Sequence, residues 1–420
     1  MQAVTISEAS GVDLPLRAAT LWRGLRAAAL QLLLIGSAVL LVPLVPVLPS
    51  ELSGMHQYGP YLALAVAGAI GASFNRGRAI LSVLLLTLAY ALFARGVSSA
   101  TETGILVATL LPLNLAVIAL LRERGVASRY ALRRFVAFGL EFIVATWLVS
   151  GGTWLWICHT WPQLVLPPSV FSLPPIVVGA LCVSTIVTAA VLWIRGNAID
   201  AALFAAVIAC EAGAILSGTP NAYGLMIGAA ATVLAVGVLQ DAYRYAFVDE
   251  LTGLGGRRAL NERLLALGER YVIAMVDVDH FKQVNDIHGH DTGDQVLRMI
   301  ATHLARTGSG ARSYRYGGEE FAVVFPGKSS KDVIPALERL RTTVESYRML
   351  LRAEDRRPHD NAEGVERRST PTPAGAIQVT ISIGVAEPDP RSPASPEQVL
   401  RAADEALYRA KERGRNRLSR

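Results

Sequence analysis

The chain has 420 residues, of which 52% are hydrophobic, and a formal net charge of +6 at pH 7. This composition is too apolar for one soluble domain, and the length allows more than one domain. Fewer than a third of the charged side chains lie in the first 245 residues, so the chain has an apolar N-terminal part and a charged C-terminal part.

The N-terminal part is a series of apolar segments, most of them long enough to cross a hydrocarbon core of about 30 Å as a helix. They predict a transmembrane domain over residues 1–240 with about eight helices. Its input signal is left open, because no motif names a sensed or transported molecule. The predicted spans are residues 25–47, 58–72, 80–95, 104–121, 135–158, 176–194, 198–216 and 223–239.

Arginine is distributed unevenly among the loops between these segments. Arginine-containing loops precede the first span and follow the second, fourth and sixth, whereas loops 49–59, 159–175 and 217–223 contain no Lys or Arg. Only Arg95 departs from the pattern. Because cytoplasmic loops collect Lys and Arg, we expect an uncleaved inner-membrane protein with both termini in the cytoplasm. Arginine in membrane loops also explains much of the positive charge, so we expect no nucleic-acid partner.

Two glutamates interrupt the apolar segments. Glu141 lies in "FGLEFIVATW" and Glu211 in "IACEAGAIL". An ionisable side chain inside a membrane is costly and marks a functional or paired site. A protonated glutamate that hydrogen-bonds between helices explains each residue equally well, and both interpretations stay open.

In the C-terminal part, a short connecting helix over residues 241–250 precedes a domain of residues 251–420 in which strands and helices alternate. This order predicts an α/β fold with helices packed on a mixed sheet. Residues 352–376 are charged and aperiodic, which predicts a flexible inserted loop. The patterns predict helices over 257–269, 292–306 (opened by a capping box of Thr292 and Gln295), 330–351 (capped by Ser330) and 395–414, strands over 271–279 and 376–387, and a hairpin around Gly317 and Gly318.

Acidic residues stand at the end of the first strand of this domain. Side chains alternate along a strand, so Asp277 and Asp279 share one face, where they offer hard oxygen ligands to a metal. The next residues, "HFKQVNDIHGHDTGD", supply a turn whose amides can point at phosphate, the cation Lys282, and Asn285, which can read a base edge. A polar surface loop is the alternative, but it does not explain why glycine, lysine and acid recur together.

The hairpin "RYGGEEF" places two glycines beside two glutamates. A two-residue turn of Gly317 and Gly318 allows a positive φ at both positions and leaves the backbone open to a bulky substrate, while Glu319 points toward Asp277. Gly-Gly is also simply a good hairpin turn, which accounts for the glycines but not for both acids.

From Asp249 to about Asn416, the chain resembles the GGDEF family of diguanylate cyclases in five motifs: "DELTGLGGRRAL", "DVDHFKQVNDIHGHDTGD", "RYGGEEF", "ISIGVA" and "ADEALYRAKERGRN". The resemblance implies a fold related to nucleotidyl-cyclase and polymerase palm domains. It implies Mg²⁺ or Mn²⁺ held by the side chains of Asp277 and Glu319 and by the Val278 carbonyl. Glu319 would also help to deprotonate the attacking hydroxyl, and Glu320 is a further catalytic candidate as a signature position.

The resemblance also implies how GTP binds. Asn285 and Asp294 match positions that hydrogen-bond guanine, although an acid at a helix start is also a favourable dipole partner. The remaining matches are a substrate contact at His290 and phosphate contacts from the amides of His280 and Phe281 and from Lys282, Lys411 and Arg415.

The implied activity is condensation of two GTP into cyclic di-GMP and two pyrophosphates by a homodimer, because each domain holds one GTP. The membrane domain would regulate this pairing. One alternative is a catalytically silent GTP-binding receptor, which usually loses signature acids. Another is a transporter with an accessory cyclase, which requires Glu141 and Glu211 to face a pathway.

Two positions depart from the family pattern. The family's inhibitory Arg-x-x-Asp is replaced by Gly308 and Ala311, which predicts that cyclic di-GMP does not inhibit through this site. Gly256 stands where the family usually has Asn, which puts the hydrogen bonds of that turn in question.

Overall fold

The computed structural model describes residues 13–47, 53–94, 102–126, 129–150, 173–216, 221–350, 376–389 and 394–420. The chain divides into two compact units, Met1–Tyr243 and Arg244–Arg420. Apart from Ala376, the predicted insert over 352–376 lies outside the described residues.

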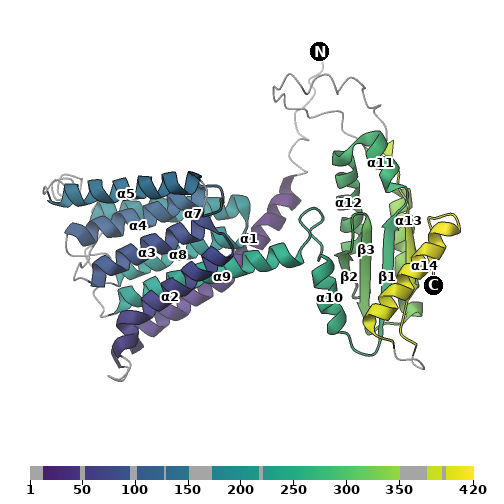
Figure 1. Cartoon of the computed structure of the whole chain (residues 1–420), viewed down its shortest axis with the longest axis horizontal. Helices are drawn as coiled ribbons and strands as arrows, with labels where there is room; N and C mark the ends of the chain where they lie inside the picture. The colour runs from purple at the N-terminus through teal and green to yellow at the C-terminus, as the bar shows by residue number, and fades with distance from the viewer. Residues whose placement is uncertain are drawn as a thin grey trace, which may run out of the picture. The chain divides into compact units, whose positions relative to one another are not determined.

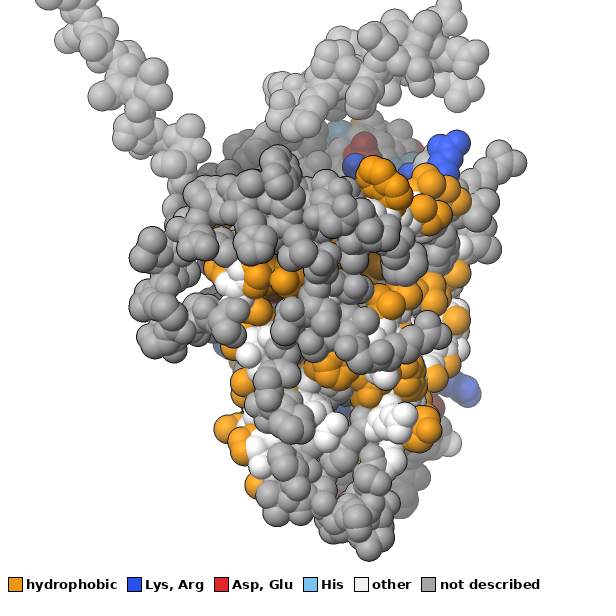
Figure 2. Space-filling view, turned by 90° about the vertical axis from the view of Figure 1, so that its left-hand side faces the viewer, with side chains coloured by type: hydrophobic (Ala, Val, Ile, Leu, Met, Phe, Trp, Pro, Cys, Tyr) orange, Lys and Arg blue, Asp and Glu red, His pale blue; other side chains and the backbone are white. Residues whose placement is uncertain are grey.

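The N-terminal unit is helical, and α9 continues to Phe247, through part of the predicted connecting helix (Figure 1). Four of its helices contain stretches long and apolar enough to cross a membrane, at 77–94, 176–195, 198–215 and 222–247, and two shorter apolar stretches lie at 28–44 and 104–120. The described helices thus show four candidate spans where the sequence predicts about eight. In the view of Figure 2, the side chains that are described are mainly hydrophobic. The helices described are α1 (Asp13–Leu41), η1 (Val42–Val47), α2 (Ser53–Ser73), α3 (Gly77–Ala94), α4 (Glu102–Leu120), α5 (Arg129–Ser150), α7 (Pro175–Arg195), α8 (Ala198–Ile215) and α9 (Ala222–Phe247).

A buried ion pair ties the ends of four of these helices together. Arg78 at the start of α3 pairs with Asp200 in the first turn of α8, and their side chains are 4% and 0% exposed. Arg78 also donates to the carbonyls of Ile118 and Ala119 at the end of α4. Arg195 at the end of α7 donates to the Ala119 carbonyl at 2.8 Å. Arg195 Nη1 also lies 3.6 Å from Oδ1 of Asp200. Loss of Asp200 would leave the buried charge of Arg78 uncompensated, so this cluster fixes how the helix ends meet.

Both glutamates of the apolar segments contact a polar side chain on the neighbouring helix. Asn114 Nδ2 of α4 donates to Glu141 of α5 at 3.1 Å. The hydroxyls of Thr185 and Ser184 in α7 donate to Glu211 of α8 at 2.6 and 3.3 Å. These contacts favour the interhelical interpretation of both residues.

The C-terminal unit is built on a five-stranded sheet with strand order β2-β3-β1-β6-β7. The central strand β1 is antiparallel to β3 and β6, and β7 is parallel to β6. The predicted α/β fold with a mixed sheet and surrounding helices is confirmed (Figure 1). The strands are β1 (Tyr271–Val278), β2 (Arg312–Arg315), β3 (Glu320–Pro326), β6 (Ile381–Ala386) and β7 (Leu418–Ser419).

Helices cover both faces of this sheet, since every residue of β1 is buried. The even-numbered residues 272–278 pack with α12 and α13, and the odd-numbered residues 271–275 pack with α10 and α14. Helix α14 lies so close to β6 that a Cβ at Gly384 would collide with its backbone. This two-sided packing holds the carboxyl end of β1 in place. The helices are α10 (Arg257–Leu265), α11 (Phe281–His288), α12 (His290–Ala305), α13 (Ser330–Ser346) and α14 (Pro396–Glu412).

The segment after β1 differs from the sequence prediction. Instead of a turn followed by a helix at 292, it forms the two helices α11 and α12, separated by Gly289 with φ 83°. The predicted capping box of Thr292 and Gln295 is wrong, because the Thr292 hydroxyl donates to the His288 carbonyl at 2.9 Å from within the first turn of α12.

Three other elements have boundaries that differ from the sequence prediction. The helix predicted over 257–269 ends at Leu265. The helix predicted over 330–351 is capped by Ser329, not Ser330, and ends at Ser346, because Tyr347 is extended; β4 (Met349–Leu350) then pairs with β5 (Ala376–Ile377). The strand predicted over 376–387 therefore divides into β5 and β6.

Candidate active site

Two carboxylates meet at the end of the central strand. Asp277 lies opposite Glu320 in the β1–β3 register, and Glu319 precedes β3, with its carbonyl accepting the Val278 amide at 3.4 Å. Asp277 is 3% exposed and Glu319 is half-buried. Burial raises the pKa of both carboxyls, and the charge of Asp277 raises the pKa of Glu319 further. A pair of hard oxygen donors that repel each other fits a divalent cation, which would remove the repulsion.

Asp279 has a different role from Asp277. Its Oδ1 accepts the Ser382 hydroxyl at 2.7 Å, and its Oδ2 accepts the Thr380 hydroxyl at 2.7 Å and the Asn416 amide at 3.0 Å. This buried carboxylate fastens β6 and the C-terminal segment to the end of β1. The expectation that Asp279 offers its oxygens to a metal beside Asp277 is therefore corrected, because other parts of the chain already occupy them.

Two cations near the C-terminus act on the carboxylate pair. Lys411 Nζ, in the last turn of α14, lies 2.8 Å from Oδ2 of Asp277. Arg415 follows α14 with φ 61°. The charges of Lys411 and Arg415 partly offset the effect of burial on the pKa of Asp277. The site thus combines two carboxylates with two basic side chains. The carboxylates suit a metal ion that binds phosphate, and the basic side chains can bind phosphate directly.

A helix end is directed toward the same edge of the sheet. His280 has φ 56° and is the N-cap residue of α11. Its carbonyl accepts the amides of Gln283 and Val284, which leaves the amides of Phe281 and Lys282 pointing out of the helix end. Such an end favours anions. The fold therefore brings the predicted phosphate contacts His280, Phe281 and Lys282 next to the carboxylates at the end of β1.

The residues expected to bind a base lie on two consecutive helices. Asn285 is in α11, and His290 and Asp294 are in the first turns of α12. A Cβ at Gly293 would overlap Oδ1 of Asn285, so any larger residue here would require the Asn285 side chain to move. Among the described residues, this Oδ1 is buried without a hydrogen-bond partner. A buried polar atom without a partner is costly, and a bound ligand is one way to supply a partner.

The glycines of the hairpin do not form the expected two-residue turn. Strand β2 ends at Arg315 and β3 begins at Glu320, so the loop is residues 316–319, and neither Gly317 nor Gly318 has a positive φ. A Cβ at Gly317 would lie 2.7 Å from Oε2 of Glu320, whereas one at Gly318 would enter open space. The space beside Gly318 is therefore open, and neither glycine has an unusual backbone conformation.

The sequence analysis missed the residues that hold this loop. Arg315 Nη2 donates to the Gly318 carbonyl at 2.7 Å, and Nη1 lies 3.0 Å from both carboxylate oxygens of Asp249. Burial acts to raise the pKa of Asp249, but hydrogen bonds from Thr252 and Arg315 outweigh it and lower the pKa. The signal was present in the sequence, since Asp249 and Arg315 belong to two of the five motifs.

The turn that contains Gly256 keeps its backbone hydrogen bonds. The Gly256 amide donates to the Phe247 carbonyl at 2.7 Å, and the Asp249 amide donates to the Leu254 carbonyl at 2.8 Å. The Arg315 amide donates to the Gly255 carbonyl at 2.8 Å. Glycine at position 256 is therefore compatible with the turn.

Known proteins resemble this part of the chain. The sequence profile described as "Diguanylate cyclase, GGDEF domain" matches residues 246–364 and 361–417. The response regulator PleD of Caulobacter vibrioides is 36% identical over 189 residues, which cover 42% of this chain and 37% of PleD. The diguanylate cyclase VdcA of Vibrio cholerae is 37% identical over 177 residues, which cover 41% of this chain and 46% of VdcA. The chain thus spans less than half the length of these two relatives.

One solved structure is also similar in sequence to this part of the chain. The coiled coil and GGDEF domain of DgcB from Caulobacter crescentus, in complex with c-di-GMP, is 35% identical and has a TM-score of 0.36. The match covers 43% of this chain and 88% of that one. The five motifs, the carboxylate pair and the profile match fall in the same region, so the C-terminal unit is a GGDEF domain, through which the chain belongs to the diguanylate cyclase family.

Proposed function

We propose that the chain is a membrane-bound diguanylate cyclase that condenses two GTP into cyclic di-GMP and two pyrophosphates. The carboxylates of Asp277 and Glu319, with Lys411 2.8 Å from Asp277, carry this proposal. They lie where the amino end of α11 favours phosphate. The relatives named above support the same activity. Retention of both acids and of Glu320 favours an enzyme over a silent GTP receptor, which needs none of them.

The residues present fit a divalent cation. Asp277, Glu319 and the Val278 carbonyl would hold Mg²⁺ or Mn²⁺, since magnesium in such sites takes one or two carboxylates and completes its shell with water and substrate phosphates. When bound, the ion neutralises charge that develops on the phosphate.

The chain's own groups then bind and orient GTP. Asn285 and Asp294 hydrogen-bond guanine, with His290 beside them. The triphosphate is held by the amides of His280 and Phe281 and by the side chains of Lys282, Lys411 and Arg415. Phosphoryl transfer depends chiefly on such positioning and charge stabilisation.

The 3′-hydroxyl of one GTP attacks the α-phosphorus of the other, so an O–P bond forms as the bond to pyrophosphate breaks. Glu319 helps to accept the proton of the attacking hydroxyl. Repetition in the opposite direction closes the ring. Because each domain binds one GTP, two chains act as a homodimer with their sites face to face.

The N-terminal unit would anchor the enzyme in the bacterial inner membrane. We propose about eight spans with both termini and the GGDEF domain in the cytoplasm. The four apolar helices and the distribution of arginine support this arrangement. The unit would regulate the enzyme by controlling how two GGDEF domains pair.

The first prediction concerns Glu319. Full-length chain, purified with its membrane unit and given GTP and Mg²⁺, should form one cyclic di-GMP for every two pyrophosphates, measured by chromatography and mass spectrometry. Glu319→Gln should lower the rate by at least about 10²-fold, because an amide supplies neither an anionic ligand nor a proton acceptor.

The matched control is Glu405→Gln on the exposed face of α14, which should keep the wild-type rate. Saturable GTP binding by the wild type without product would instead identify a silent receptor. Turnover retained by Glu319→Gln would refute the role given to that residue.

A further inference from the structure

The backbone that carries Arg415 is unusual. Gly414, Arg415 and Asn416 follow one another with φ of 105°, 61° and 45°. Residues other than glycine pay a conformational cost in this region, so two of them in succession persist only where the surroundings hold them.

Asn416 supplies three of the hydrogen bonds that hold this segment. Its backbone amide donates to Oδ2 of Asp279 at 3.0 Å, and its side-chain Nδ2 donates to Oε1 of Glu345 at 2.6 Å. Its Oδ1 accepts from Nη1 of Arg341 at 2.9 Å. Asp279 directly follows Val278 at the end of β1, so Asn416 joins the end of the central strand to helix α13.

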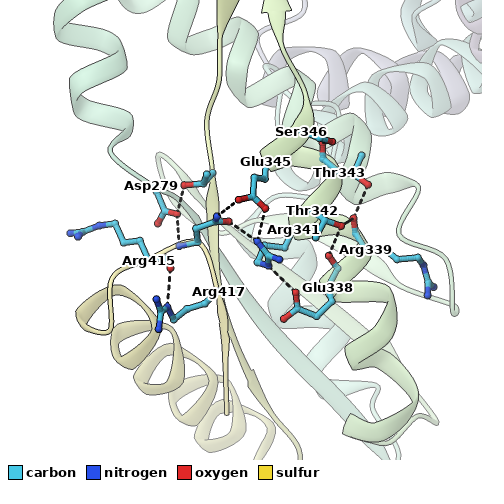
Figure 3. Close-up of polar contacts among 12 residues, drawn as sticks. Asp279, Glu338, Arg339, Arg341, Thr342, Thr343, Glu345, Ser346, Arg415 and Arg417 are labelled. Carbon is cyan, nitrogen blue, oxygen red and sulfur yellow. Dashed lines mark hydrogen bonds and ion pairs between the residues drawn. The ribbon is translucent and has the colours of Figure 1, made fainter.

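Helix α13 presents a preorganised support for Asn416. Arg341 bridges Glu338 at 2.8 Å and Glu345 at 2.9 Å, so its guanidinium is fixed on the helix surface (Figure 3). The hydrogen bonds from Asn416 and Arg341 lower the pKa of Glu345. The neighbouring Arg339 is exposed and points away from this network (Figure 3).

Arg415 extends on the other side of the same segment. In Figure 3 its side chain points away from Arg341 and Glu345. The Arg415 carbonyl accepts a hydrogen bond from Nε of Arg417 at 2.9 Å, which fixes the peptide group. The Arg415 side chain is exposed. Arg415 lies four residues after Lys411, whose Nζ is 2.8 Å from Oδ2 of Asp277, and the charge of Arg415 also acts to lower the pKa of that buried carboxyl.

We propose that Asn416, supported by Arg341 and Glu345, is a positioning residue for Arg415. It keeps the segment in its left-handed conformation and so holds the guanidinium where the triphosphate of GTP binds. Without the Asn416 side chain, Arg415 is no longer presented to the phosphates. This inference rests on the proposed function, since it assigns Arg415 to that substrate.

The test is a double-mutant cycle in the full-length chain. Asn416→Gly removes both side-chain hydrogen bonds but tolerates φ 45°, so it isolates the contacts from backbone strain. We expect Asn416→Gly and Arg415→Ala each to raise the KM for GTP by about three- to tenfold, with a smaller change in kcat. The double variant should bind no more weakly than Arg415→Ala alone, because Asn416 acts through Arg415.

Helix α13 offers the matched controls. Arg341→Ala should raise KM in the same way, whereas Arg339→Ala, two residues away, should not. Glu345→Gln, which keeps an oxygen for Asn416, should retain more GTP affinity than Glu345→Ala. Thermal unfolding of each variant separates a loss of stability from a loss of affinity.

The proposal is overturned if the KM effects of Asn416→Gly and Arg415→Ala multiply, or if Arg341→Ala lowers the unfolding temperature without changing KM. If the wild type makes no cyclic di-GMP, the cycle is read from the Kd of GTP by calorimetry. The failure of the proposed catalytic function is thereby distinguished from the failure of this inference.

Discussion

Asp277 and Glu319 are the residues on which the proposed chemistry depends, and each is held in an environment that disfavours its charge. Their carboxyl pKa values are raised from ordinary values of 3.8 and 4.5. Without a cation, the folded chain therefore keeps protons that the unfolded chain releases. These groups make the free energy of unfolding fall as pH rises from the ordinary to the raised pKa. A divalent cation would remove this penalty.

The raised pKa values predict pH-dependent metal binding. The cation must displace protons from both carboxyls. As the pH is lowered, its affinity should therefore fall by up to about tenfold per pH unit for each proton released. This fall should begin at a higher pH than for ordinary carboxylates. The Kd of Mn²⁺ for the full-length chain without nucleotide can be followed by electron paramagnetic resonance at a series of pH values. A Mn²⁺ affinity that stays unchanged as the pH is lowered to about 5 would contradict the assignment of Asp277 and Glu319 as its ligands.

The control for this titration is Asp277→Asn. It should weaken Mn²⁺ binding and make the remaining binding less dependent on pH, because one titrating ligand is gone. Asp404→Asn, an exposed acid on α14, should change neither quantity.

Single residues were predictable where one strand or one motif positions them. Asp277 and Glu319 were identified because they stand at strand ends. Asp279 was wrongly predicted to offer its oxygens to a metal. Alternation predicts which face of the strand it shares with Asp277, but not its hydrogen-bond partners Thr380, Ser382 and Asn416, which are more than a hundred residues away in sequence. The Arg315–Asp249 pair was missed although both residues belong to the quoted motifs, because the motifs do not show that these two side chains meet. Such contacts depend on the assembled sheet, which local pattern does not contain.

At the scale of elements, the turn between α12 and β2 bears on regulation. Gly308, Ser309 and Gly310 have φ of 78°, 54° and 75°, and the Ala311 amide donates to the Gly308 carbonyl at 2.9 Å. An arginine at position 308 would be strained in this conformation. The turn therefore lacks both charged groups of the family's inhibitory pair and folds in a way that disfavours the first of them.

We predict that cyclic di-GMP does not inhibit the enzyme through this turn. Initial rates of pyrophosphate release should be unchanged at micromolar product, because no bidentate arginine–phosphate contact is available from position 308. Weak inhibition at higher product should disappear as GTP is raised, since the product then competes at the active site. Inhibition that GTP does not relieve would contradict the prediction, and Arg306→Ala and Arg312→Ala would then test the flanking arginines.

Long elements were predicted better than short ones. The central strand and helix α14 lie close to their expected ranges, because their patterns extend over many residues. Helix α11 spans only residues 281–288 and was taken for a turn. The positive φ of Gly289 that separates it from α12 is permitted by glycine but not required by it. The strands β4 and β5 have two residues each, too few for alternation to be recognised.

At the scale of the whole molecule, the uneven charge distribution predicts two parts that join near residue 245, and the contacts within the structure divide the chain at 243/244. Hydropathy alone does not fix the number of spans, because helices such as α1 and α4 have only shorter apolar stretches. The buried pair of Arg78 and Asp200 was not predicted, since its members are far apart in sequence: Arg78 lies in a predicted loop and Asp200 near the start of a predicted span.

The location of the loops distinguishes eight spans from four. With eight spans, Met55 lies on the periplasmic side of the membrane, whereas Val126 and the C-terminus are in the cytoplasm. If only the four candidate spans α3, α7, α8 and α9 cross the membrane, Met55 and the C-terminus lie on the same side and Val126 on the other. Single cysteines can be placed as Met55→Cys, Val126→Cys and Arg420→Cys after Cys158, Cys182 and Cys210 are replaced by serine. Neither Met55→Cys nor Val126→Cys alters the loop arginines that set orientation.

An impermeant maleimide applied to intact spheroplasts should label Met55→Cys alone, and permeabilisation should expose the other two. Labelling of Val126→Cys from outside while Met55→Cys stays protected would establish four spans instead. Labelling of Arg420→Cys from outside would place the GGDEF domain away from cytoplasmic GTP and contradict the proposed function as well. Production of cyclic di-GMP by each cysteine variant shows that the labelled protein is folded, so the labelling pattern reports topology rather than misfolding.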